Sequence, residues 1–164
     1  MKATILALST ALFLSACAGG HDSNDNAGSH IGGVSSQMSK VTTINECQGG
    51  RATALTDAFS GWHTVFQAPR MIFTLNFQFD RFGQLTMTNN CHFDGIGDLS
   101  ATAHSTYRDS GSSFEILAAA HDEEQGGGMT CNVNVAQATV AYGFEGRCLV
   151  LNDPKAGKLY LLPN

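Results

Sequence analysis

The chain has 164 residues, of which 43% are hydrophobic and 14% are charged, and its formal net charge at pH 7 is −5. This composition excludes a polyelectrolyte that stays unfolded over most of its length, and three prolines without a glycine period exclude collagen-like and proline-rich fibrous proteins. The length suits one globular domain. No phosphate-binding loop and no Gly-x-Ser-x-Gly motif occurs, so the sequence predicts no particular enzymatic activity.

The first residues predict export. Lys2 is followed by Ala3–Leu14, an uncharged run that is too short for a bilayer-spanning helix of roughly 20 residues and fits a secretory signal peptide. The run ends in Leu14-Ser15-Ala16-Cys17, which resembles the lipobox of bacterial lipoproteins. The resemblance implies that residues 1–16 are removed and that the thiol of Cys17 carries diacylglycerol.

A lipidated Cys17 would anchor a mature chain of 148 residues to a membrane, because two or more acyl chains hold a protein firmly there. The loss of Lys2 makes the net charge −6, and so acidic a domain attracts neither nucleic acid nor anionic head groups. Ala18 stands where an aspartate often retains lipoproteins in the inner membrane. By this analogy we expect the outer membrane, with the domain facing the periplasm.

Residues 17–45 predict a flexible tether. The stretch is rich in Gly, Ser, Asn and Asp and shows no hydrophobic period, so it cannot bury enough apolar surface to fold alone. Asp22–Asn26 imitates the start of a calcium loop, but Ala27 and Gly33 occupy the positions that need glycine and glutamate. We therefore expect no metal site there and place the folded domain at residues 46–164.

From Trp62 onward, alternating apolar and polar residues predict strands. Met71–Phe79 is the clearest case, with five apolar side chains on one face and mostly polar ones opposite. Ala52–Phe59 predicts one or two helical turns, Asp122–Gly128 predicts a polar loop, and Ala136–Phe144 is either a strand or an irregular connection. The other predicted strands are Gln84–Asn90, Leu99–Tyr107, Ser113–Ala120, Met129–Val135, Arg147–Asn152 and Lys158–Leu162.

About eight strands with no repeated helix between them predict an all-β, antiparallel fold. An up-and-down β-barrel buries the shared apolar face and removes sheet edges, and a two-sheet sandwich is the alternative. The short helix, Gly61-Trp62 at the start of the first strand and Arg147 in a late strand resemble the lipocalin/calycin barrels, over about 100 residues from Leu55 to the end. Family members usually have one residue between the glycine and the tryptophan, which are adjacent here.

The remaining cysteines predict disulfides. Apart from Cys17 there are four, an even number that suits an oxidising compartment, and no two have the C-x₂₋₄-C spacing of a zinc site. Of the three possible pairings we favour Cys47–Cys148 with Cys91–Cys131. Closing a barrel would bring the segment before the first strand beside the late strands.

The apolar strand face is the main candidate for a binding site. The interior of a small barrel either holds one small ligand or is filled by side chains. The bulky rings favour filling, whereas the alanines would leave room, and Trp62 suits a plug at a barrel's end. The residues that would line a cavity are Trp62, Phe73, Phe77, Ala101, Ala103 and Phe114.

Polar candidates are few. His92 and Asp94 have the i, i+2 spacing of one strand face and could share a proton or a metal, although a surface pair is the commoner outcome. His104 is expected in solvent on the polar face of its strand. His121–Glu124 offers ligands for a divalent cation, but an acidic loop tip is the simpler interpretation. We expect no catalytic residue, cofactor or metal.

Two functions follow as expectations. The first is a non-enzymatic, membrane-anchored envelope lipoprotein whose disulfide-bonded barrel is a partner-binding or structural module. The alternative is a lipocalin-like carrier of a small apolar ligand, such as a fatty acyl chain. A hydrolase with scattered catalytic groups is a weaker third hypothesis.

Overall fold

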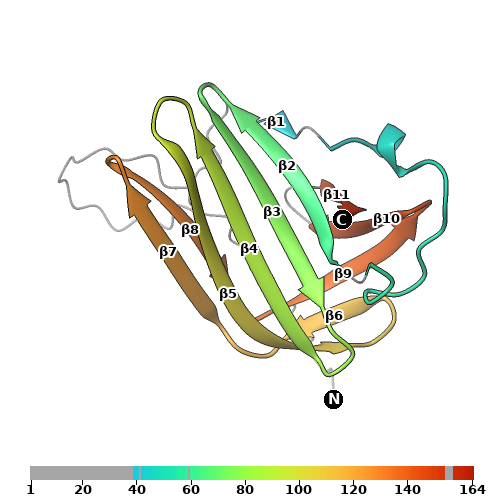
Figure 1. Cartoon of the computed structure of the whole chain (residues 1–164). Coiled ribbons are helices and arrows are strands. Elements are labelled where there is room, and N and C mark those ends of the chain that lie inside the picture. The colour runs from blue at the N-terminus through green and yellow to red at the C-terminus, as the bar shows by residue number, and fades with distance from the viewer. Residues whose placement is uncertain (1–38, 41, 59, 154–156) are drawn as a thin grey trace, which may run out of the picture.

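The computed structural model describes residues 39–40, 42–58, 60–153 and 157–164 (Figure 1). The expected signal peptide, Cys17 and most of the expected tether lie outside these ranges. The described elements are one 3₁₀ helix and eleven strands. They are β1 (Ser39–Lys40), η1 (Ile44–Cys47), β2 (Trp62–Ala68), β3 (Met71–Phe79), β4 (Gln84–Phe93), β5 (Gly97–Asp109), β6 (Ser113–Ile116), β7 (Ala120–Gly126), β8 (Met129–Val135), β9 (Ala138–Glu145), β10 (Cys148–Asp153) and β11 (Gly157–Pro163).

Eight of the strands close an antiparallel β-barrel. Their order is β2-β3-β4-β5-β6-β9-β10-β11, and β11 pairs with β2 where Leu162 lies opposite His63. The expected barrel of about eight strands is confirmed, but its members differ in part from the expected set. Ala136–Phe144, for which the sequence left a strand and an irregular connection open, holds all of β9 except Glu145, and β9 is a barrel strand between β6 and β10.

The alternation of side chains explains the barrel wall. In β3, Phe73, Leu75, Phe77 and Phe79 are buried inside the barrel, while Ile72 is exposed outside. The neighbouring strands β4 and β5 continue the same two faces, because the register joins inward residues to inward ones. Period-2 patterning therefore specifies which face each strand presents to the core.

β7 and β8 form a separate hairpin, inserted between β6 and β9. The prediction of a loop at Asp122–Gly128 is wrong, because most of this segment is β7. β8 is a strand as expected but not part of the barrel. Periodicity could not find β7, since its residues are polar on both sides. Its carboxylates attach it to β5: Asp122 accepts a hydrogen bond from the backbone N–H of Thr102 at 2.7 Å, and Glu124 accepts one from Ser100 at 2.5 Å.

β8 packs against the inner face of the barrel wall. Cys91 of β4 is buried at 1% exposure and forms a disulfide with Cys131 of β8. Beside this bridge, the side-chain amide of Asn89 donates to the carbonyl oxygen of Asn132 at 2.8 Å. Val133 and Val135 of β8 belong to the same core cluster as Ala101 and Ala103 of β5. The space that small residues leave on β5 is thus filled by a strand of the chain itself.

The segment before β2 is part of the fold. Ser39 and Lys40 pair with Gln67 and Phe66, and the hydroxyl of Thr42 accepts a hydrogen bond from the backbone N–H of Val65 at 3.1 Å. The folded part therefore begins before the boundary expected at residue 46. The structure has bends and turns in residues 54–58, where one or two helical turns were predicted, and the carboxylate of Asp57 accepts hydrogen bonds from the backbone N–H groups of Thr53 and Ala54.

The two disulfides have the pairing that the sequence analysis favours. Cys47, at the end of η1, is joined to Cys148 at the start of β10, and Cys91 is joined to Cys131. The first bridge holds the segment that precedes the barrel against the late strands. The second fixes the hairpin to the inner wall.

Candidate functional site

Most of the predicted lining residues meet in the interior. Trp62, Phe77, Ala101, Ala103 and Phe114 are buried within one core cluster, at exposures of 3% or less. Phe73 lies apart, in a second cluster with the Cys91–Cys131 bridge and Phe93. Phe66 packs against both clusters and so lies between them.

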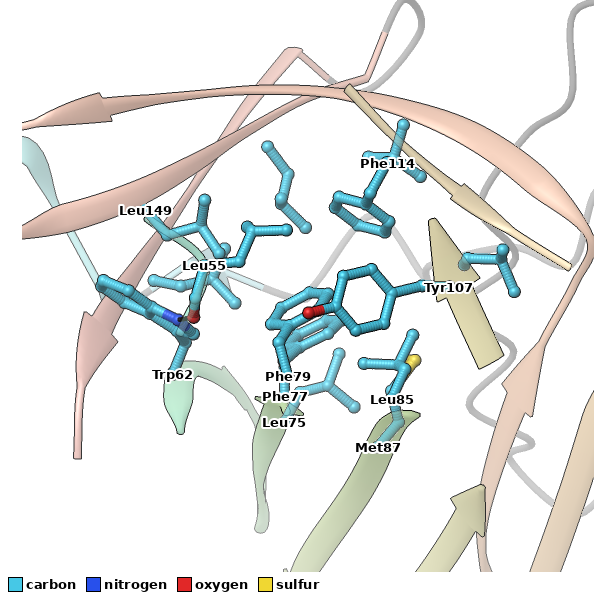
Figure 2. Close-up of a cluster of buried hydrophobic side chains, with 14 of the residues drawn as sticks. Leu55, Trp62, Leu75, Phe77, Phe79, Leu85, Met87, Tyr107, Phe114 and Leu149 are labelled. Carbon is cyan, nitrogen blue, oxygen red and sulfur yellow. Dashed lines mark hydrogen bonds between the residues drawn. The ribbon is translucent and has the colours of Figure 1, made fainter. Parts of the chain in front are cut away.

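Aromatic rings fill the larger cluster (Figure 2). The ring of Phe79 lies edge-on to those of Tyr107 and Phe114, with centroids 5.0 and 5.1 Å apart. Tyr142 follows, at 6.0 Å from Phe114. Trp62, at the start of β2, is 1% exposed, and its indole N–H donates to the carbonyl oxygen of Leu55 at 2.7 Å, which joins the segment before β2 to the core.

The phenols in this cluster keep polar partners. Tyr107 donates to the carbonyl oxygen of Asp80 at 2.7 Å, and Tyr142 donates to a carboxylate oxygen of Asp109 at 2.8 Å. Burial raises the pKa of both phenols above the ordinary value, and the hydrogen bond to Asp109 raises the pKa of Tyr142 further. Both therefore stay protonated donors at neutral pH, which fits a structural role.

Among the residues that the structure describes, two polar side-chain atoms of the interior have no hydrogen-bond partner. They are Oγ1 of Thr64, whose side chain is fully buried, and Oδ1 of Asn89, which is 8% exposed. Leu75 lies between them in the register, so both atoms belong to one row across β2, β3 and β4. Buried polar groups are normally satisfied, so a water or another small donor is expected at this level of the barrel.

The outer wall of β3, β4 and β5 carries a regular polar surface, which we call the polar face. In Figure 1 these strands face the viewer and no other described element lies in front of them. Four registered rows make up the polar face: Ile72–His92–Asp98, Thr74–Asn90–Ser100, Asn76–Thr88–Thr102 and Gln78–Thr86–His104.

Each row of the polar face contains one side-chain hydrogen bond between β4 and β5. Nδ1 of His92 lies 2.6 Å from a carboxylate oxygen of Asp98, and the hydroxyl of Ser100 donates to Oδ1 of Asn90 at 2.8 Å. Farther along, Thr88 and Thr102 are 3.0 Å apart, and Thr86 lies 3.1 Å from Nδ1 of His104. The partners fix one another, so the polar groups are ordered before any ligand arrives.

A groove of about 430 Å³ occupies the first two rows. It is lined by residues of β3, β4 and β5, with one from the neighbouring β7: Ile72, Thr74, Asn90, Cys91, His92, Asp98, Leu99, Ser100 and Glu124. Asp94 stands at its edge, with its carboxylate 3.7 Å from Nε2 of His92. His92 thus lies between two carboxylates. Sequence spacing pairs His92 only with Asp94, because Asp98 comes opposite His92 through a register that the turn between β4 and β5 sets.

The other polar candidates do not form a second site. In His121–Glu124 the strand alternation separates the acids: Asp122 and Glu124 bind β5, while Glu123 lies 3.7 Å from His121. His104 is exposed, as expected. No group of three or more metal-binding side chains occurs in the part of the chain that the structure describes. A further depression, about 540 Å³, is lined largely by Gly50–Thr53 and Phe144 and offers one charged side chain.

Comparison of the chain with family models, with curated proteins and with solved structures gives no match. The architecture alone defines the class to which the protein belongs: a small, closed, antiparallel β-barrel with an inserted hairpin and two disulfides. Among the described residues, no helix is both long and apolar enough to cross a bilayer.

Proposed function

We propose that this protein is a non-enzymatic envelope lipoprotein. It would be anchored through acyl chains on Cys17 and would bind its partners through the outer surface of the barrel. The observation that carries the proposal is the filled interior. The rings of Phe79, Tyr107 and Phe114 contact one another, and β8 covers Ala101 and Ala103. A barrel filled by its own side chains is a scaffold, so recognition falls to its surface.

The anchor has a direct test. Cells that express the full chain are grown with a radiolabelled fatty acid, beside cells that express the Cys17→Ser variant. We expect label on the first protein only, with the variant unprocessed or in the soluble fraction. Equal labelling of both proteins would contradict the lipid anchor at Cys17.

The scaffold is tested by native mass spectrometry of the lipidated protein after incubation with palmitate. We expect the mass of the chain with its covalent acyl groups and two disulfides, and no further adduct. A stoichiometric adduct that leaves on denaturation would overturn the scaffold and favour the carrier.

The alternative, a carrier of a small apolar ligand, has one specific observation in its favour. Oγ1 of Thr64 and Oδ1 of Asn89 face the interior without partners, and a ligand with a hydroxyl or amide group would satisfy them. With hexadecanol, which carries a hydroxyl group, in place of palmitate, an adduct that is lost in an Asn89→Leu variant and kept in the solvent-facing Asn90→Leu variant would assign the ligand to this row.

A further inference from the structure

We propose that the groove on the polar face binds one or two units of an uncharged, hydroxyl-rich carbohydrate chain. The inference rests on the proposed function, which assigns recognition to the outside of the barrel, and names the class of partner. Three observations lead to it: the absence of lysine and arginine from the four rows, the paired polar side chains and the exposed isoleucine in the groove.

Charge selects against ionic partners. The four rows of the polar face contain no lysine or arginine and one carboxylate, Asp98. The carboxylates of Asp98 and Glu124 line the groove and that of Asp94 lies at its edge, so they would repel an anionic ligand. Asp98 lies in a hydrogen bond with His92, and Glu124 accepts one from the N–H of Ser100, so a cation would compete with partners already present. A neutral ligand keeps these contacts.

Sugar hydroxyl groups suit the hydrogen-bond acceptors and donors of the groove that its own side-chain pairs leave free. An ionised carboxylate has about four acceptor positions, so Asp98 and Glu124 can each accept further hydrogen bonds from sugar hydroxyls. Asn90 uses Oδ1 for Ser100, which directs its amide donors to other acceptors. The groove therefore presents acceptors and donors close together, as a ring of vicinal hydroxyls requires.

Ile72 supplies an apolar contact. Its side chain is 39% exposed at the start of the polar face, beside His92 in the register. Binding sites for small molecules commonly combine apolar surface with a few placed polar groups. The C–H face of a sugar ring would cover this isoleucine, whereas a hydrated ion would not.

Order in the free protein lowers the cost of binding. The polar pairs of all four rows are already hydrogen-bonded between β4 and β5, on two of the longest strands of the barrel. Side chains that are fixed beforehand lose less rotamer entropy on binding.

The test uses the full lipidated protein in a zwitterionic detergent that contains no sugar. Binding of chitotetraose and of cellotetraose is measured by isothermal titration calorimetry, with tetralysine as a charged comparison. We expect saturable binding of at least one saccharide and none of tetralysine. Failure of both saccharides, or binding of tetralysine alone, would overturn the proposal.

Two matched amide variants locate the site. Asn90→Ala, in the groove, should weaken saccharide binding at least tenfold, and Asn76→Ala, one row beyond the groove, should change it less than twofold. Ser100→Ala is a second groove variant in case Asn90→Ala lowers the thermal midpoint. Saccharide binding that is unchanged in both groove variants would place the ligand elsewhere and overturn the assignment. None of these outcomes alters the fatty-acid labelling or the mass of the barrel, so the proposed function is tested independently.

Discussion

Gly146 lies where the backbone at Cys47, at the end of η1, packs closely against the turn between β9 and β10. It has φ +60°, and a Cβ there would lie 2.0 Å from the carbonyl oxygen of Cys47. The adjacent N–H of Arg147 donates to this same oxygen at 3.0 Å. A side chain at position 146 would therefore force two backbone segments apart, next to the Cys47–Cys148 bridge.

We predict that Gly146→Ala lowers the free energy of unfolding by about 2–4 kcal/mol, because it combines an unfavourable φ with a backbone clash. The matched control is Gly95→Ala, whose φ is +81° and whose Cβ would meet nothing within 4 Å. That variant should lose only about 1 kcal/mol. Urea unfolding with intact disulfides measures both changes, and equal losses would contradict the clash.

Asp57 gives the molecule a pH-dependent contact. Its carboxylate accepts hydrogen bonds from the backbone N–H of Thr53 at 2.6 Å and of Ala54 at 2.8 Å, and these lower its pKa below the ordinary value of 3.8. Because the folded pKa is the lower one, the contact stabilises the protein fully above pH 3.8. The stabilisation is lost as the pH falls through the folded pKa.

We therefore predict that Asp57→Ala costs about 1 kcal/mol at pH 7, a modest value because water screens the exposed carboxylate. The difference from the parent protein should shrink below pH 3.8. Urea unfolding at pH 7, 5, 3 and 2 measures this difference in the free energy of unfolding. Glu115→Ala, which removes an exposed carboxylate 3.8 Å from Arg108, is the control. A loss from Asp57→Ala that stays constant down to pH 2 would contradict the role of the charge.

At the scale of elements, the attachment of β7 to β5 leads to a third prediction. Asp122→Ala with Glu124→Ala removes the acceptors for the N–H groups of Thr102 and Ser100. Amide exchange at these two positions should accelerate at least about tenfold, the equivalent of about 1.4 kcal/mol. The hairpin should stay in place, since the Cys91–Cys131 bridge holds β8.

Hydrogen exchange followed by NMR gives the residue resolution that this prediction needs. Glu123→Ala is the matched control, because its carboxylate lies 3.7 Å from His121 and does not bind β5. If the exchange rates of the Ser100 and Thr102 amides were unchanged in the double variant, the two carboxylates would not hold β7 against β5.

The same strands show which parts of the fold are readable from sequence. β3 was predictable because its burial alternates without exception from Phe73 to Phe79. β7 was not, since its seven residues are intermediate or exposed and its link to β5 runs through side chains. Sequence periodicity detects a strand that is buried on one face. It does not detect β7, whose carboxylates accept hydrogen bonds from backbone N–H groups of β5 in place of backbone carbonyls.

The candidate site was readable only in part. The composition of the polar face follows from the alternation that predicts β3, β4 and β5, whereas the groove depends on register. His92 meets Asp98 because the turn from Asp94 to Gly97 pairs Phe93 with Gly97. Likewise, Ala101 and Ala103 suggested free space in the interior, and the strand that covers them begins 26 residues after Ala103. Contacts of this range depend on tertiary packing.

For the molecule as a whole, the two disulfides constrain the unfolded chain to different degrees. Cys47–Cys148 spans 101 residues and Cys91–Cys131 spans 40. In the loop-entropy model the longer bridge contributes about 4.7 kcal/mol and the shorter one about 3.9 kcal/mol. Both are buried at 3% exposure or less, so their replacement by alanine leaves similar cavities.

We predict that Cys47→Ala with Cys148→Ala lowers global stability more than Cys91→Ala with Cys131→Ala, by about 0.8 kcal/mol. The second pair should have the larger local effect, because the loss of its bridge leaves β8 attached to the wall by noncovalent contacts, such as the hydrogen bond from Asn89 and the packing on β5. Urea unfolding measures the free energy of unfolding of each double variant, and hydrogen exchange in residues 129–135 measures the local effect on β8. A greater global loss from the Cys91–Cys131 variant would show that the hairpin inside the wall, and not the length of the closed loop, determines what each bridge contributes.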